Sequence, residues 1–222
     1  MLNHNQPPFF SKAIRDSMKL RVETYDTHFD LEKIFDTVQL LRDHWDKRAP
    51  NIEFYTLGKT VYLDGNTPAY FECREGINPI LFKYFGFMYE DLREMLSVIL
   101  GEPIFFRRAF ALPGFHVFPS DPQFLSMCGP WHVDLPHNTL GLGDQDTQAF
   151  TIAIKLPTGG GGMDMKISGK EEYIEYEEGK MYLHPGTDVH RISCYKEYVP
   201  DEYRITLQGH FVRDNGKLIT FW

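Results

Sequence analysis

The chain has 222 residues, of which 42% are hydrophobic and 15% aromatic, a size and composition that predict a folded domain with a substantial core. Its formal net charge of -8 would repel a phosphate backbone, and no run of Lys and Arg offsets this charge. We therefore expect no nucleic-acid partner.

The start of the chain and its cysteines suggest where the protein works. The first ten residues, MLNHNQPPFF, lack the basic and apolar regions of a secretory signal, so we expect none. No apolar run approaches the roughly 20 residues that span a bilayer, so we expect no membrane segment. The three cysteines, Cys73, Cys128 and Cys194, are odd in number and widely spaced, which favours a reducing compartment over a disulfide framework. A cytoplasmic location is the resulting expectation.

The first hundred residues predict helices mixed with extended chain. Apolar residues recur every three or four positions between 31 and 45, which indicates an amphipathic helix with Asp30 as its N-cap and Pro50 beyond its end. Residues 53–68 are rich in β-branched and aromatic side chains and predict a strand with a turn at Asp64-Gly65. A second helix is predicted from about Asn78 to Gly101.

From Pro103 onward the pattern changes to short strands separated by turn residues, as in an antiparallel sandwich or barrel. The predicted strands are IFFRRAFAL, FHVFP, AFTIAIKLP, EEYIEYEEG, KMYLHPG and EYRITLQGHFVR. The glycines of Thr158–Gly162 indicate either a flexible hairpin tip or a place where the backbone passes close to another group. No linker or repeat divides the chain, so we expect one domain over 1–222, with 1–102 supporting a β core at 103–213.

The stretch GPWHVDLPH, residues 129–137, holds the first candidate for chemistry. On a strand, residues i and i+2 point the same way, so His132 and Asp134 can present a nitrogen and a carboxylate oxygen to one ion. Alone, this pair has an equally simple interpretation as two polar residues on one strand face. The pair becomes informative only with a third ligand.

His190, in GKMYLHPGTDVHRIS, is the candidate for that ligand. A strand there could return beside His132 and Asp134. Two histidines and one carboxylate on one face of a metal leave three positions open, which suits non-haem Fe(II) and oxygen chemistry. Zinc would more often take a closed tetrahedral set of ligands.

Fourteen positions later, Arg204 and Thr206 share one face of an alternating strand in YRITLQGHF. A buried arginine needs an anion, because an unpaired buried charge is costly. An internal Asp or Glu is one possible partner. The other is the distal carboxylate of a dicarboxylic keto acid, which a guanidinium and a neighbouring hydroxyl would hold by charge-assisted hydrogen bonds.

In this order, His132-x-Asp134, His190 and Arg204-x-Thr206 resemble the HxD...H...RxS/T pattern of the Fe(II)- and 2-oxoglutarate-dependent oxygenases. The intervening FTIAIKLPTGGGGMDM is similar to the strand, Gly-Gly turn and strand that follow HxD in many of them, and GKMYLHPG resembles the strand before the distal histidine. The resemblance covers about residues 103–213, roughly half of the chain.

The resemblance implies a fold, a metal and a reaction. The fold would be mainly β with flanking helices (α+β), a cupin-like double-stranded β-helix or jelly roll whose N-terminal helices pack on the larger sheet. His132, Asp134 and His190 would bind Fe(II) and act in catalysis, while Arg204 and Thr206 would anchor the 2-oxoglutarate cosubstrate. The enzyme would use O2 to hydroxylate a C–H bond of a small-molecule substrate, releasing succinate and CO2. Halogenating relatives lack the carboxylate, so the presence of Asp134 favours hydroxylation, with desaturation and ring formation left open.

Other residues have simpler interpretations. His137, His184, His116 and His210 are expected in structural or supporting roles, by hydrogen bonding or core packing. Trp131 could wall the metal site, and Arg191 could contact a substrate carboxylate, although burial and a surface ion pair are the ordinary alternatives. The rival function is a cupin-like barrel that binds a metal or ligand without oxidation, for which Arg204 and Thr206 are not required.

Overall fold

The computed structural model describes residues 22–142 and 147–222, and these form a mainly β structure. Twelve strands are present in the described residues: β1 Glu23–Asp26, β2 Asp46–Ala49, β3 Ile52–Leu57, β4 Ile104–Phe106, β5 Gly114–Pro119, β6 Gln148–Lys155, β7 Gly162–Ile167, β8 Lys170–Glu175, β9 Lys180–Pro185, β10 His190–Ile192, β11 Tyr203–Asp214 and β12 Lys217–Phe221. The α-helices are α2 Leu31–Leu40, α3 Val61–Asp64, α4 Pro68–Phe71, α5 Ile77–Leu100 and α6 Pro136–Thr139. Short 3-10 helices cover Arg42–His44, Glu72–Arg74 and Pro122–Leu125.

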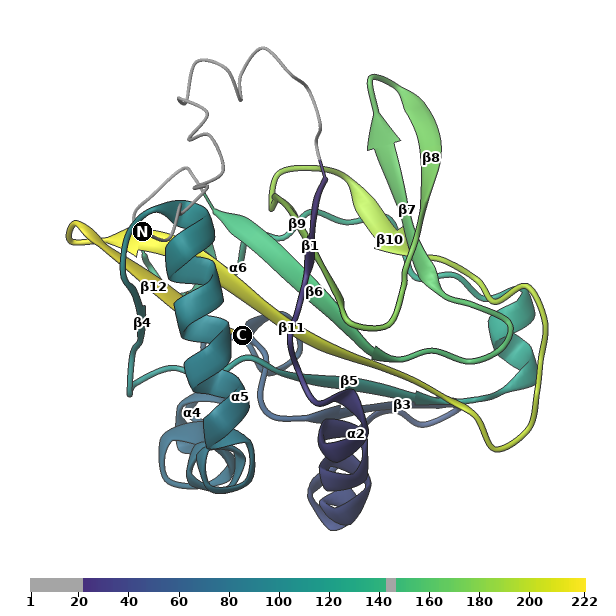
Figure 1. The fold of residues 1–222 in the computed structure, drawn as a ribbon, viewed down its shortest axis with the longest axis horizontal. Helices are drawn as coiled ribbons and strands as arrows, with labels where there is room; N and C mark the ends of the chain where they lie inside the picture. Colours follow the sequence, from purple (N-terminus) through teal and green to yellow (C-terminus); the bar gives the residue numbers. More distant parts are fainter. Residues whose placement is uncertain (1–21, 143–146) are drawn as a thin grey trace, which may run out of the picture.

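The strands build one large and one small sheet. The large sheet has nine strands, in the order β1-β9-β6-β11-β5-β3-β2, with β12 added beside β11 and β4 beside β12. All its pairs are antiparallel except β12 with β4. The small sheet has the order β10-β7-β8. In Figure 1, β6 and β11 run between the helices α2 and α5 and the projecting hairpin of β7 and β8.

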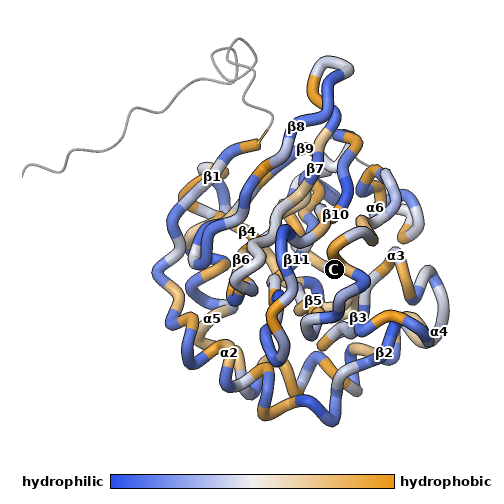
Figure 2. The backbone as a smooth tube through the Cα atoms, turned by 90° about the vertical axis from the view of Figure 1, so that its right-hand side faces the viewer, coloured by the Kyte–Doolittle hydropathy of each residue, from blue (hydrophilic) through white to orange (hydrophobic). Residues whose placement is uncertain are grey.

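The alternation along β11 separates two environments. Ile205 and Leu207 belong to the largest hydrophobic cluster, which also contains Ile34 of α2 and Phe85 of α5. Arg204 lies on the opposite face, where its Nη2 donates to the carbonyl oxygen of Gly162 in β7 at 2.9 Å. The face of β11 that carries Ile205 and Leu207 therefore belongs to the hydrophobic cluster, and its opposite face lies toward the small sheet. The outermost strand of the small sheet, β8, is largely hydrophilic (Figure 2).

The first predicted helix is present but shorter than predicted. Asp30 caps α2 by accepting a hydrogen bond from the backbone N–H of Lys33 at 3.1 Å. The helix ends at Leu40, however, and residues 46–49 form β2 instead of continuing it. The cause is non-local, because β2 pairs with β3 in the large sheet, and this pairing is invisible to helical periodicity.

The strand predicted over residues 53–68 is confirmed only in its first part. β3 ends at Leu57, and Val61–Asp64 form the helical turn α3. Asp64 stabilises this turn, because its Oδ2 accepts from the backbone N–H of Thr60 at 2.7 Å and its carboxylate also binds Arg48. The second predicted helix is confirmed as α5, which ends at Leu100 and has Gly101 as its C-cap, with a positive φ of 72°.

Two expectations about cysteines and glycines are settled by the structure. The expectation that the cysteines are unpaired is wrong for Cys128 and Cys194, which form a disulfide across a separation of 66 residues, while Cys73 is free and buried. Of the two interpretations of the glycine run, the close approach is confirmed, because a Cβ on Gly159 would lie 2.1 Å from the carbonyl oxygen of Glu197. The hairpin tip is wrong, because the run connects β6 of the large sheet to β7 of the small sheet, and these two strands do not pair. In the parts of the chain that the structure describes, no helix is long and apolar enough to cross a membrane.

Candidate metal centre

Two neighbouring segments bring the three predicted ligands together. Residues 129–134, which carry His132 and Asp134, run beside residues 186–192, which carry His190; we call these the two ligand segments. His132 and His190 form an isolated antiparallel bridge, in which each backbone N–H donates to the other residue's carbonyl oxygen at 2.9 Å. Because bridged residues point their side chains to the same side, both imidazoles face the same space.

The side chains of these residues form a compact set of donors. One ligand atom each from His132, Asp134 and His190 lie within 4.8 Å of one another. Oδ1 of Asp134 is 3.8 Å from Nε2 of His132, and Oδ2 is 3.3 Å from Nε2 of His190. A metal ion about 2 Å from each donor fits between atoms at these separations. Two imidazoles and one carboxylate match the donor set that binds non-haem Fe(II) with open positions.

Backbone carbonyls orient both imidazoles. Nδ1 of His132 lies 2.9 Å from the carbonyl oxygen of Pro130, and Nδ1 of His190 lies 2.8 Å from that of Asp188. A carbonyl only accepts, so each Nδ1 carries a proton and each Nε2 faces the shared space, where it would bind a metal ion once it is unprotonated. Such partners fix the ring orientation of metal-binding histidines.

A third histidine, which sequence reasoning placed in a packing role, lies against the carboxylate. Nε2 of His210 in β11 is 3.4 Å from Oδ2 of Asp134, and the His210 side chain is buried. Burial by itself would raise the pKa of Asp134, but hydrogen bonds from His190 and His210 and their charges outweigh it and hold that pKa well below its usual range. Asp134 is therefore an anion, the form that binds a cation.

Arg204 supplies an unusual buried cation. Its side chain is 3% exposed, and its guanidinium carbon lies 5.3 Å from the ring centroid of Tyr176. Nη2 donates to Gly162, but Nε and Nη1 are buried without a hydrogen-bond partner among the described residues. Because the one hydrogen bond of this guanidinium in the described chain goes to a backbone carbonyl, the internal Asp or Glu partner considered from the sequence is not found there. The unsatisfied donors fit an anion from outside the chain.

Two side chains with hydroxyl groups, Thr206 and Tyr195, belong to the neighbourhood of Arg204. Thr206 is 1% exposed and pairs in register with His116 of β5, two residues along β11 from Arg204. Burial raises the pKa of Tyr195 to about 12 against the opposing effect of the Arg204 charge, so its hydroxyl is neutral and able to donate. That hydroxyl is buried and has no partner within the described residues. Arg204, Thr206 and Tyr195 are thus hydrogen-bond donors suited to a carboxylate.

The remaining candidates lie in other surroundings. His184 packs edge-on against His190, with ring centroids 4.6 Å apart, and burial lowers its pKa to about 4. Nε2 of His116 is hydrogen-bonded to the hydroxyl of Tyr62. His137 is buried in α6.

Trp131 and Arg191 contact each other. The guanidinium of Arg191 lies 4.3 Å from the Trp131 ring, and its Nε binds Asp164 at 2.9 Å. Arg191, which the sequence suggested as a partner for a substrate carboxylate, is thus already paired with the carboxylate of Asp164.

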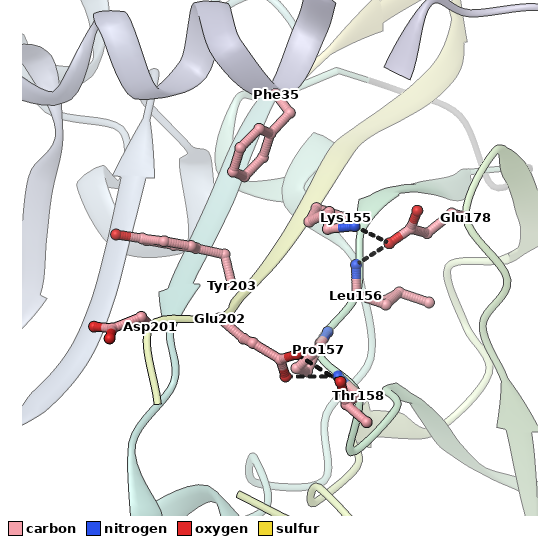
Figure 3. Close-up of a pocket in the computed structure, with 9 residues that line it drawn as sticks. All are labelled: Phe35, Lys155, Leu156, Pro157, Thr158, Glu178, Asp201, Glu202 and Tyr203. Atoms are coloured by element: carbon pink, nitrogen blue, oxygen red, sulfur yellow. Dashed lines mark hydrogen bonds and ion pairs between the residues drawn. The ribbon is translucent and has the colours of Figure 1, made fainter. Parts of the chain in front are cut away.

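A surface pocket of about 390 Å³ lies at another place, between α2 and the ends of β6 and β11 (Figure 3). Lys155 binds Glu178 there, and Glu202 accepts from both the hydroxyl and the backbone N–H of Thr158. These polar groups are therefore paired with each other. None of the three predicted metal ligands lines this pocket.

Comparison with known proteins identifies structures of similar fold but no relative by sequence. No protein-family profile matches the chain, and no curated protein matches it by sequence. Solved structures do resemble it. A novel N-substituted L-amino acid dioxygenase from Burkholderia ambifaria AMMD aligns with a TM-score of 0.56 at 12% identity, covering 95% of this chain and 89% of that one. An oxidoreductase of the 2OG-Fe(II) oxygenase family from Burkholderia pseudomallei aligns with a TM-score of 0.55 at 12% identity, covering 96% and 95%.

A third similar structure is the non-haem alpha-ketoglutarate-dependent carbocyclase SnoK from nogalamycin biosynthesis, with a TM-score of 0.53, 10% identity and coverage of 92% and 87%. Identities this low speak for architecture, not for a shared substrate or reaction. The chain thus has the fold of Fe(II)- and 2-oxoglutarate-dependent oxygenases, and in that fold it carries a His-Asp-His cluster.

Proposed function

We propose that the chain is an Fe(II)- and 2-oxoglutarate-dependent dioxygenase that hydroxylates a C–H bond of a small-molecule metabolite or natural-product intermediate. The observation that carries the proposal is the combination of the His132, Asp134 and His190 donors with the unpaired buried guanidinium of Arg204. A metal-binding barrel without oxidation needs the first of these but not the second. The proposal includes a single oxygenase domain with a double-stranded β-helix core, located in the cytoplasm.

The chain's residues would divide the work between two places. His132, Asp134 and His190 would hold Fe(II), with both Nδ1 protons anchored on carbonyl oxygens so that the Nε2 atoms stay aimed at the ion. Arg204 and Thr206 would bind the distal carboxylate of 2-oxoglutarate, and Arg204 supplies two donors that have no other partner in the described residues.

Bound Fe(II) and 2-oxoglutarate together supply the activation of O2 that oxidises a substrate C–H bond, with succinate and CO2 as co-products. The protein's part is to keep the carboxylate of Asp134 ionised and to place the cosubstrate between Arg204 and the three ligands. Retention of Asp134 favours hydroxylation over halogenation. The resemblance to a carbocyclase structure makes ring formation the second reaction to test.

The test is anaerobic titration of the metal-free protein with Fe(II) and then with 2-oxoglutarate, followed by a screen for small molecules that stimulate succinate release. We expect metal binding first, 2-oxoglutarate binding that depends on the metal, and succinate formation that depends on O2. Metal binding with no measurable affinity for 2-oxoglutarate would refute the oxygenase and favour the cupin-like sensor.

A further inference from the structure

Only a few backbone hydrogen bonds join the two ligand segments. Their backbone hydrogen bonds are Gly129 N to Ile192 O at 3.1 Å, His132 N to His190 O and His190 N to His132 O at 2.9 Å, and Asp134 N to Gly186 O at 2.7 Å. In the described chain, only the His132–His190 pair within this contact forms a β-bridge. Any separation of the segments therefore moves His132 and Asp134 away from His190.

Glycines at both ends show that the two segments lie against each other with no spare room. A Cβ on Gly129 would lie 2.5 Å from Cγ2 of Ile192. A Cβ on Gly186 would lie 2.3 Å from the carbonyl oxygen of Asp134. The spacing of the ligands thus depends on a close approach that is held by only four backbone hydrogen bonds between the two segments.

The Cys128–Cys194 disulfide lies at one end of this contact. Cys128 immediately precedes Gly129, and Cys194 follows Ile192 by two residues, so the bond joins the segments just beyond their last hydrogen bond. The bridge closes a separation of 66 residues. A covalent link between ends so far apart in sequence removes many conformations in which the two segments lie apart.

The same bond borders the predicted cosubstrate site. Ser193, next to Cys194, donates its backbone N–H to the carbonyl oxygen of Gly162 at 3.2 Å, and Arg204 donates to that same oxygen at 2.9 Å. Tyr195, on the other side of Cys194, carries the buried unpaired hydroxyl described above. The segment that the disulfide holds therefore lies against both the metal ligands and the Arg204 guanidinium.

We propose that the Cys128–Cys194 disulfide is a redox-sensitive clamp that holds the two ligand segments together and thereby sets the affinity of the site for a divalent metal. This inference rests on the proposed function, since it assumes that His132, Asp134 and His190 bind a metal. It goes beyond that function by making metal occupancy depend on the thiol redox state.

The redox step needs only a dithiol reductant. The two thiols of the reductant lose two electrons and two protons and form a disulfide. The Cys128–Cys194 disulfide accepts these electrons and protons and becomes two thiols. Both cysteines are partly exposed, so a reductant can reach them.

The test measures the affinity for Co(II) of the oxidised and the reduced metal-free protein. The protein is reduced with a dithiol and desalted without air, because free dithiol would chelate the ion, and alkylation followed by mass spectrometry confirms two new thiols. Co(II) binding is then followed by its visible absorption. We expect about tenfold or more weaker binding in the reduced protein, with unchanged far-UV circular dichroism.

Matched variants separate the clamp from other effects of thiols. The double variant Cys128→Ser and Cys194→Ser should show the weakened affinity without reduction and should not respond to dithiol. Cys73→Ser removes the buried free thiol and should bind Co(II) and respond to dithiol as the wild type does. Because serine does not replace a thiolate as a ligand, the double variant also tests whether new thiols capture the ion.

Each outcome has one meaning. Equal affinity in the oxidised and reduced proteins overturns the clamp and leaves the metal site intact. A loss of affinity that merely follows a loss of circular dichroism also overturns it, since the bond would then act on the whole fold. Failure of the oxidised wild type to bind Co(II) or Fe(II) refutes the proposed function itself, and the clamp with it.

Discussion

One oxygen of Asp134, Oδ2, lies between two histidines, 3.3 Å from Nε2 of His190 and 3.4 Å from Nε2 of His210. His190 comes from the small sheet and His210 from the large one. If His190 turns its Nε2 lone pair to a metal, His210 remains as a hydrogen-bond donor that keeps the carboxylate in place. His210 therefore links the metal centre to β11, the strand that also carries Arg204.

We expect His210→Ala to weaken metal binding by about tenfold or more, because groups that orient a ligating carboxylate have effects of that size. His210→Gln should recover part of the affinity, since its amide can donate to Asp134 Oδ2. Anaerobic titration with Fe(II) or Co(II) measures both. An His210→Ala protein with wild-type affinity would show that Asp134 needs no support from β11.

The ligand assignment has its own test. His132→Ala, Asp134→Ala and His190→Ala should each lower iron affinity severely and abolish turnover, because each removes one of three protein donors. His184→Ala is the matched control, since His184 contacts His190 but is not part of the donor cluster. Retained metal binding in His190→Ala together with lost binding in His184→Ala would reassign the distal ligand.

The Arg204→Lys variant tests whether the protein binds 2-oxoglutarate, as an oxygenase would, or only a metal, as a non-oxidising barrel would. Lysine keeps the charge but removes the planar fork, so the apparent affinity for 2-oxoglutarate should fall about tenfold or more if roughly 1.5 kcal/mol of charge-assisted bonding is lost. Thr206→Val should give a smaller loss, and iron affinity should barely change in either. The measurement is the 2-oxoglutarate dependence of succinate formation, after circular dichroism confirms folding. If Arg204→Lys left the 2-oxoglutarate dependence of succinate formation unchanged, β11 would not be the strand that anchors the cosubstrate.

His116 predicts an acid-sensitive fold. Burial first, and then the charge of Arg204, lower its pKa from the usual 6.5 to about 3. Between these values the unfolded chain binds a proton that the folded chain excludes, so stability falls as the pH drops from 6.5 toward 3. At pH 5 this one residue would remove about 2 kcal/mol.

The measurement is urea unfolding of metal-free wild type and His116→Gln at pH 7 and pH 5. The glutamine cannot titrate, so the variant should lose about 2 kcal/mol less than the wild type over this interval, while all carboxylates contribute to both. An equal loss in the two proteins would show that His116 is protonated in the folded state.

Local patterns in the sequence, together with the family resemblance, predicted the three residues that form the His-Asp-His cluster. The spacing of His132 and Asp134 placed them on one side of an extended segment, and His190 does return beside them. Strand alternation likewise placed Arg204 and Thr206 together, and both are buried. The His132–Asp134 and Arg204–Thr206 spacings follow the two-residue period of extended chain, which a sequence displays directly, although only Arg204 and Thr206 lie in a strand of the structure.

What the sequence could not reveal depends on pairings between distant segments. His210 has no local mark that distinguishes it from a packed histidine, because its partner Asp134 lies on another segment. Cys128 and Cys194 looked unpaired because an odd count and wide spacing carry no information on which two meet. β2 forms where helix was predicted because β3 offers it a partner.

The side chain of His132 is 46% exposed, whereas that of His190 is 9% exposed. The centre is therefore open on one flank and closed on the other. A chelator would detach the ion by first displacing His132, with no need for the sheets to separate, so we expect ions to exchange through the open flank in the folded protein. The metal found after purification would then record the ions present during growth and handling, and the native metal must be identified by reconstitution.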